Sequence, residues 1–146
     1  LRHLPTIFIA EINGRAAGSG NEFVVQCDMS FAGPDALISA PEVTSGGLAG
    51  NGGAQYVVRA LGMQKAAEYL LTGSPVTGAQ ADQLGWVTRA FDSQAKLRNH
   101  VDDLATRMAL LDPGALNITK VAIRAWGPSE DQIQQDLAST LRFLPT

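Results

Sequence analysis

The sequence predicts an α/β protein in which short strands alternate with short helices and are followed by a helical region. Two observations carry this prediction. Thirteen of the fifteen glycines precede residue 86, where turns separate short apolar runs. From residue 92 onward, helix-capping residues alternate with amphipathic stretches of helical period. We therefore divide the chain into residues 1–91 and 92–146, which together have the size of one compact domain.

The first elements are a strand, a turn and a short helix. The apolar run at residues 7–12 predicts a buried strand, which Asn13-Gly14 ends. Ser19 and Glu22 have the spacing of a capping box, so we expect a helix over residues 19–26.

Two further strands and a long loop come next. Residues 29–32 and 37–39 flank the turn Gly33-Pro34-Asp35, which predicts a strand on each side. A glycine-rich loop then occupies residues 41–53, and loops of this length usually have a function.

The centre of the chain predicts two helices and a strand. Residues 64–71 have helical character, and Gly73 ends that helix. Thr77 is the expected cap of a second helix that ends near Gly85, and residues 87–91 predict a short strand.

Three capped helices complete the prediction. Ser93 opens the first, Asp112-Pro113 opens the second, and Ser129 with Gln132 opens the third. Apolar residues at helical spacing mark the first and third of them: Leu97, Val101, Leu104, Met108 and Leu111, then Ile133, Leu137, Leu141 and Leu144.

Composition excludes several classes of protein. The chain is 45% hydrophobic and 17% charged, so it can form a core and is not a disordered tail. Its net charge of −3 and its scattered basic residues argue against a nucleic-acid partner. No apolar run approaches the roughly 20 residues of a membrane span, so we expect no membrane partner.

Cysteine and histidine offer no metal or disulfide site. Cys27 is the one cysteine, so no intrachain disulfide can form, and we expect it to pack as a small apolar side chain. This leaves the compartment open, with a cytoplasmic protein as the simplest expectation. His3 and His100 lack the spacing of metal ligands, and we expect His100 on an exposed helix face.

Two acidic residues stand in glycine-rich settings. Glu22 ends the segment Gly18-Ser19-Gly20-Asn21-Glu22, and Glu42 precedes a glycine-rich stretch at residues 46–53. A glycine turn that runs into a helix start presents free backbone N–H groups, which can hold an oxyanion. Two nearby carboxylates could then transfer protons, one as base to water and the other as acid to carbon.

A structural interpretation of each acid remains open at this point. Glu22 can serve as the capping-box acid of Ser19, and Glu42 can be a solvated loop residue. Nucleotide phosphate binding is disfavoured, because no glycine loop continues into Gly-Lys-Ser/Thr and the third glycine of a dinucleotide fingerprint is absent.

The segment from Ile12 to Asp28 resembles the crotonase superfamily, the enoyl-CoA hydratase/isomerase family. Matching residues continue along the chain: Pro41-Glu42-Val43, Gly46, Gly50, Gly52-Gly53-Ala54-Gln55, Arg59, Leu70-Leu71-Thr72-Gly73, Ala81 and Gly85-Trp86-Val87. The resemblance implies a partial crotonase-like ββα spiral with its catalytic loops at residues 1–91. It also implies a C-terminal helical region for oligomerisation or as a lid at residues 92–146.

The resemblance also implies site residues. Glu22 and Glu42 match the two acids that flank a catalytic water in hydratases of this family. Ser19 matches the position whose backbone N–H forms half of the oxyanion hole, and Gly50 matches a backbone position near the water. Lys120 looks like the helix lysine that approaches CoA phosphates, with a solvated lysine as the alternative.

The expected activity is addition of water across the double bond of an enoyl-CoA thioester. Acyl-CoA is then the substrate, with no tightly bound cofactor and no metal, and we expect a homo-oligomer, trimer or hexamer. The alternatives are an isomerase that uses mainly Glu42 and a non-catalytic, shortened assembly module.

The sequence also departs from the family pattern. Ser19 stands where glycine is usual, and Ala49 stands where proline is common. Asn51 and Tyr56 also differ, so we expect an acyl pocket of altered shape. Family members normally have an N-terminal half with the other oxyanion amide, and this chain resembles the part that follows it.

Overall fold

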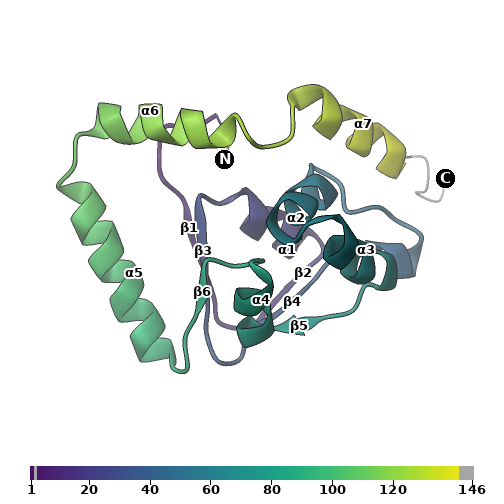
Figure 1. Ribbon diagram of the computed structural model, residues 1–146, viewed down its shortest axis with the longest axis horizontal. Helices are drawn as coiled ribbons and strands as arrows, with labels where there is room; N and C mark the ends of the chain where they lie inside the picture. The colour runs from purple at the N-terminus through teal and green to yellow at the C-terminus, as the bar shows by residue number, and fades with distance from the viewer. Residues whose placement is uncertain (2, 142–146) are drawn as a thin grey trace.

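The computed structural model describes residues 1 and 3–141. Strands and helices alternate in its first part, and three longer helices follow (Figure 1). In chain order the elements are β1 (Ile9–Ile12), β2 (Arg15–Ala17), α1 (Ser19–Gln26), β3 (Met29–Ala32), β4 (Leu37–Ser39), the 3-10 helix η1 (Glu42–Ser45), α2 (Gly53–Leu61), α3 (Met63–Thr72), β5 (Val76–Thr77), α4 (Gly78–Leu84), β6 (Arg89–Ala90), α5 (Gln94–Ala109), α6 (Pro113–Arg124) and α7 (Glu130–Leu141).

The six strands of the described residues form two small sheets of three strands each. β1, β3 and β6 form a parallel sheet in that order, with Ile9 opposite Met29. β2 pairs in parallel with β4, and β5 joins β4 in antiparallel orientation. The first two turns of the chain each add one strand to each sheet before passing into helices, whereas α4 separates β5 from β6. This arrangement is the partial ββα spiral that the sequence predicts.

The core lies among the sheets and the short helices. Ala32 and Phe31 are adjacent on β3 and point to opposite faces, as the period of a strand requires. Ala32 joins the main cluster, whereas Phe31 packs with Leu97 and Val101 and so docks α5 on β3. The main cluster comprises Ile12, Ala16, Val24, Ala32, Ala36, Ile38, Val57, Leu61, Ala66, Val76, Ala81, Trp86 and Val87.

The last three helices follow one another around the outside of this core (Figure 1). Their predicted caps are confirmed: Ser93 Oγ accepts a hydrogen bond from the Lys96 amide, and Asp112 Oδ1 accepts one from the Ala115 amide. Ser129 and Gln132 bond each other reciprocally. Leu144 lies outside the described residues.

The sequence prediction missed four of the described elements: β2, η1, α2 and the two-residue strand β5. β2 is three residues long and carries two alanines, so it lacks the β-branched and aromatic residues that indicate a strand. α2 begins at Gly53, where a run of glycines conceals the start of the helix.

The predicted exposure of His100 is wrong. Its ring centroid lies 5.0 Å from that of Phe31 and 5.0 Å from that of Phe91. The side chain is half-buried because α5 turns this position toward the aromatic cluster on β3.

Candidate active site

The site begins at the N-terminus of α1. Gly18 is the N-cap, with φ 56° and ψ −125°, a conformation that glycine alone adopts readily. The predicted capping role of Ser19 is wrong, because Ser19 is already the first helical residue and no side chain caps α1. Its amide belongs to the first turn, where N–H groups have no intrahelical acceptor. The oxyanion role of that amide stays a prediction.

Glu22 is buried one turn into α1, with 7% of its surface exposed. Its Oε2 accepts a hydrogen bond of 3.0 Å from Asn51 Nδ2, so the capping-box interpretation of this acid is contradicted. A Cβ at Gly53 would lie 3.0 Å from Glu22 Cγ. The start of α2 therefore has to be glycine for the Glu22 side chain to fit.

Glu42 begins η1, and its carboxylate is turned inward. Both carboxylate oxygens are buried, and neither has a hydrogen-bond partner in the described part of the chain. Burial raises the pKa of the Glu42 carboxyl, the Glu42 backbone amide partly opposes this increase, and the negative charge of Glu22 makes the smallest contribution, which also raises the pKa. The solvated-loop interpretation of Glu42 is therefore wrong.

Glu42 also approaches the N-terminus of α1. A Cβ at Gly18 would lie 3.6 Å from Glu42 Oε1. The carboxylate of Glu42 thus faces the residue that precedes the Ser19 amide, and it lies within electrostatic range of Glu22. The structure brings together the two acids and the helix start, which are far apart in the sequence.

The loop over residues 47–53 connects the two acids. At one end, a Cβ at Gly47 would lie 3.3 Å from the Glu42 carbonyl oxygen. At the other end, Asn51 and Gly53 contact Glu22. Gly50 is buried between them, and its carbonyl accepts a hydrogen bond of 2.7 Å from the Gly53 amide.

An apolar cavity of about 290 Å³ borders Glu42. Small side chains line much of it, including Ala49, at the position that the sequence singled out as a departure. Glu22 does not line this cavity and packs against Gly53 instead. The full lining is Ala40, Glu42, Val43, Gly47, Leu48, Ala49, Ala54, Val58, Met63, Ala67, Leu70 and Leu71.

Lys120 lies away from the acids, in a buried ion cluster. Its side chain is only 2% exposed, so the solvated-lysine alternative is wrong. Nζ donates to Asp28 Oδ2 at 2.9 Å and to the Thr6 carbonyl at 2.6 Å, and it lies 5.0 Å from the ring centroid of Phe8. Two of the three ammonium hydrogens are thus engaged within the chain, and the contact with CoA phosphates stays a prediction.

Asp28 is the centre of that ion cluster, and sequence reasoning missed it. Arg124 Nη2 donates to Asp28 Oδ1 at 2.8 Å, and the Phe8 amide donates to Oδ2 at 2.9 Å. Burial alone would raise the pKa of Asp28, but the donors from Phe8, Lys120 and Arg124 outweigh it and lower the pKa. A single acid beside an apolar strand, far from any basic residue in sequence, gave no signal of this cluster.

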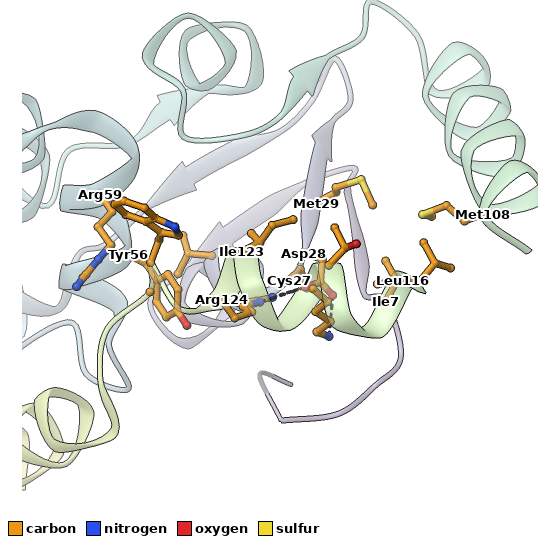
Figure 2. A pocket seen from close by; sticks show the side chains of 15 residues that line it. Ile7, Cys27, Asp28, Met29, Tyr56, Arg59, Met108, Leu116, Ile123 and Arg124 are labelled. Carbon is orange, nitrogen blue, oxygen red and sulfur yellow. Dashed lines mark hydrogen bonds and ion pairs between the residues drawn. The ribbon is translucent and has the colours of Figure 1, made fainter. Parts of the chain in front are cut away.

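A second cavity, of about 410 Å³, adjoins the same cluster. Figure 2 shows Asp28 and Arg124 between Tyr56 and Arg59 on one side and Met29 and Met108 on the other. Cys27 also lines it, and burial raises the pKa of its thiol. Neither Glu22 nor Glu42 lines this cavity, so it is separate from the acid pair.

Comparison with known proteins identifies the family. The sequence profile described as Enoyl-CoA hydratase/isomerase matches residues 1–143. The chain belongs to this family, within the crotonase superfamily. The crotonase-like fold that the sequence predicts is confirmed.

Two relatives show how much of the family the chain represents. It is 39% identical over 116 residues to the 2,3-dehydroadipyl-CoA hydratase of Escherichia coli (strain K12), a match that covers 80% of this chain and 45% of that protein. It is 33% identical over 135 residues to the Short-chain-enoyl-CoA hydratase of Clostridioides difficile, covering 92% of this chain and 86% of that one. The chain thus spans about half the length of the first relative.

Solved structures agree on the fold. A Streptomyces avermitilis protein assigned as an enoyl-CoA hydratase superposes with a TM-score of 0.96 at 36% identity, over 100% of this chain and 53% of that chain. The Bacillus anthracis enoyl-CoA hydratase superposes with a TM-score of 0.79 at 30% identity, over 97% and 52% of the two chains. The crotonase fold of these enzymes therefore includes every element described here.

The described residues contain neither a metal-binding cluster nor a helix able to span a membrane. Residues 1 and 3–141 contain no group of three or more His, Cys, Asp or Glu side chains that could hold a metal ion. In the same part of the chain, no helix combines the length and apolar character that crossing a membrane requires.

Proposed function

We propose that this protein adds water across the double bond of an enoyl-CoA thioester, with Glu22 and Glu42 as the acid/base pair. The observation that carries the proposal is that the Glu42 carboxylate faces Gly18 at the N-terminus of α1, the helix that carries Glu22, and lies within electrostatic range of the Glu22 carboxylate. The names of the two relatives, hydratases of 2,3-dehydroadipyl-CoA and of short-chain enoyl-CoA, support the reaction class.

The surroundings of the two acids favour different roles. Glu42 has a buried carboxyl with a raised pKa, so it is suited to hold a proton and to deliver it to carbon. Glu22 accepts a hydrogen bond from Asn51, which holds its carboxylate in place for the role of taking a proton from water. Two carboxyl groups in different environments are a recurring basis for separate acid and base roles.

Hydration consists of two proton transfers and the formation of one carbon–oxygen bond. Glu22 removes a proton from water, and the water oxygen bonds to the β carbon of the enoyl group. The electron pair of the double bond moves onto the thioester oxygen, where the Ser19 amide is our proposed donor. Glu42 then transfers its proton to the α carbon, and the carbonyl is restored. Each well-placed donor to such an oxyanion contributes about 2.7–4 kcal/mol.

Replacement of each acid by its amide tests the proposal in the intact protein. We expect Glu22→Gln and Glu42→Gln each to reduce hydration of a short enoyl-CoA by at least about 100-fold, because general acid–base catalysis contributes that much. Glu68→Gln, an exposed acid on α3, is the control and should leave the rate unchanged.

Three outcomes would contradict the hydratase proposal. Full hydration by both variants would remove the acid pair from the mechanism. Double-bond migration that only Glu42→Gln abolishes would identify the isomerase alternative. Absence of heat in titration calorimetry with any acyl-CoA, together with tight self-association, would identify the assembly module.

A further inference from the structure

Asn51 occupies an unusual backbone position beside Glu22. It is the one non-glycine residue with positive φ, 50°, in the described part of the chain. Asparagine tolerates this left-handed conformation better than most residues. Glycine meets the same requirement on either side of it, at Gly46 and Gly52, both with φ 75°. The backbone therefore does not explain why residue 51 carries a side chain.

The Asn51 side chain makes one specific contact. Its amide Nδ2 donates to Glu22 Oε2 at 3.0 Å. This leaves Oε1 of Glu22 without that donor, as the oxygen that can accept a proton. An amide has no titratable proton of its own, so this contact restrains the Glu22 carboxylate without exchanging a proton with it.

The loop that carries Asn51 is held from two sides. The Asn51 carbonyl accepts a hydrogen bond of 3.4 Å from Gln26 Nε2 on α1. Next to it, Gly52 packs against the C-terminal region, where an added Cβ would lie 3.0 Å from Ile133 Cγ1 and 3.2 Å from Pro128 Cγ. Both contacts involve the backbone of the loop, and neither involves the Asn51 side-chain amide.

The other acid lacks such a partner. Glu42 on η1 is the titratable group that faces Glu22, and its pKa is raised by burial and by the charge of Glu22. Asn51 therefore makes the pair unequal: one carboxylate has an amide donor, and the other has no protein donor in the described part of the chain.

We propose that Asn51 is a positioning residue that holds Glu22 as the proton acceptor and so assigns the base and acid roles within the pair. It acts through Glu22 and does not touch the reacting atoms. This inference rests on the proposed hydratase function, in which Glu22 takes the proton from water and Glu42 delivers the other proton to carbon.

Two substitutions separate the amide from the backbone requirement. Asn51→Gly keeps the left-handed conformation and removes the donor. Asn51→Asp keeps the size and the tolerance of this conformation but places a second negative charge beside Glu22. Gln26→Met is the matched control, because it removes the bond to the Asn51 carbonyl and leaves the amide contact in place.

The pH profile of the intact protein is the decisive measurement. We expect Asn51→Gly to lower kcat about 10- to 100-fold, as for other hydrogen bonds to charged groups, with little change in KM. The acid limb is the part of the pH profile in which kcat/KM falls as the pH is lowered. It should move to higher pH in Asn51→Gly and further in Asn51→Asp, because each change disfavours the carboxylate form of the proposed base, Glu22. Gln26→Met should leave the acid limb in place.

Each result supports or overturns the proposal. An acid limb that stays in place in both Asn51 variants overturns it, even if kcat falls, since a structural role alone would lower the rate. If Asn51→Gly does not fold, the acid limb of Asn51→Asp decides. The Glu22→Gln variant distinguishes the two possible failures. If the proposed hydratase function is wrong, Glu22→Gln retains hydration activity. If only the role of Asn51 is wrong, Glu22→Gln is inactive.

Discussion

The side chains of Glu22 and Glu42 each pack closely against a glycine. A Cβ at Gly53 would lie 3.0 Å from Glu22 Cγ, and one at Gly18 would lie 3.6 Å from Glu42 Oε1. Glycine is therefore required for a different reason at Gly53 than at Gly18. Gly53 makes room for Glu22, whereas Gly18 supplies the positive φ with which α1 begins.

Gly53→Ala is expected to displace Glu22 and impair catalysis more than folding. The new methyl group would push the Glu22 side chain away from Asn51, and a misplacement of about 1 Å can reduce a rate about 100-fold. Steady-state kinetics and thermal unfolding of the intact protein measure the two effects. Gly14→Ala, where an added Cβ meets nothing within 4 Å, is the control. Equal rates in the two variants would contradict this expectation.

Glu22→Gln is expected to lower the pKa of Glu42. The Glu22 charge disfavours ionisation of Glu42, so its removal favours the carboxylate, while burial keeps the pKa of Glu42 above its ordinary value. The ¹³C chemical shift of the Glu42 carboxyl, followed through a pH titration in both proteins, measures the change. An unchanged or higher pKa of Glu42 would show that the two carboxylates do not sense each other.

At the scale of elements, ion pairs attach α6 to the rest of the protein, whereas apolar packing attaches the other helices. Lys120 and Arg124 on α6 both reach Asp28, and Arg124 also donates to the Gln26 carbonyl at 2.5 Å. The outer residues of α6 are exposed, so this cluster is the principal contact that fixes the helix in place. Without Lys120, Asp28 would lose one charged donor and keep Arg124 and the Phe8 amide.

Lys120→Met should lower the free energy of unfolding by about 1.5–3 kcal/mol, the usual contribution of a hydrogen bond to a charged group. The matched control is Lys96→Met, which removes an exposed pair with Asp92 and should change stability by less than about 1 kcal/mol. Chemical denaturation measures both. Normal stability of Lys120→Met together with a raised KM for acyl-CoA would instead favour the CoA-phosphate role of this lysine.

The contribution of this cluster depends on pH. The folded-state pKa of Asp28 is lowered, so the cluster stabilises the protein fully above the ordinary carboxyl range, and this stabilisation is lost as pH falls through the folded-state pKa. The difference in unfolding free energy between the natural protein and Lys120→Met should therefore shrink below about pH 4. A constant difference down to pH 2 would contradict the role given to Asp28.

At the scale of the whole molecule, α6 presents an apolar outer surface. Ile118 is 72% exposed, Val121 63%, Ile123 66% and, just beyond the helix, Trp126 85%. Several large apolar residues exposed on one helix favour association with another protein surface. They support the prediction of a homo-oligomer.

Light scattering is expected to find a trimer or a hexamer. Ile118→Glu, which places a charge on this surface, should shift the protein toward smaller species. Thr106→Glu on the exposed part of α5 should not. A monomer at every concentration would contradict the prediction.

Local patterns predicted β1, β3, β4 and β6 and the caps of α4 to α7, and they singled out the two acids, because each of these depends on residues that are close in sequence. The capping box at Thr77 and Gln80 illustrates this. The partners of the acids depend on contacts between distant segments: Asn51 reaches Glu22 across 29 positions, and Asp28 meets Lys120 across 92. The short strand β2 and the burial of His100 were missed for the same reason, since packing on distant elements decides both.

The alternation of strands between the two sheets has one further consequence. Glu22 belongs to the first winding of the chain, after β2, whereas Glu42 and the loop at residues 47–53 belong to the second, after β4. Neither winding alone contains both acids. Because β1 pairs with β3 and β2 pairs with β4, strand pairing holds the two windings together, and their separation would expose the Glu42 carboxyl and lower its pKa.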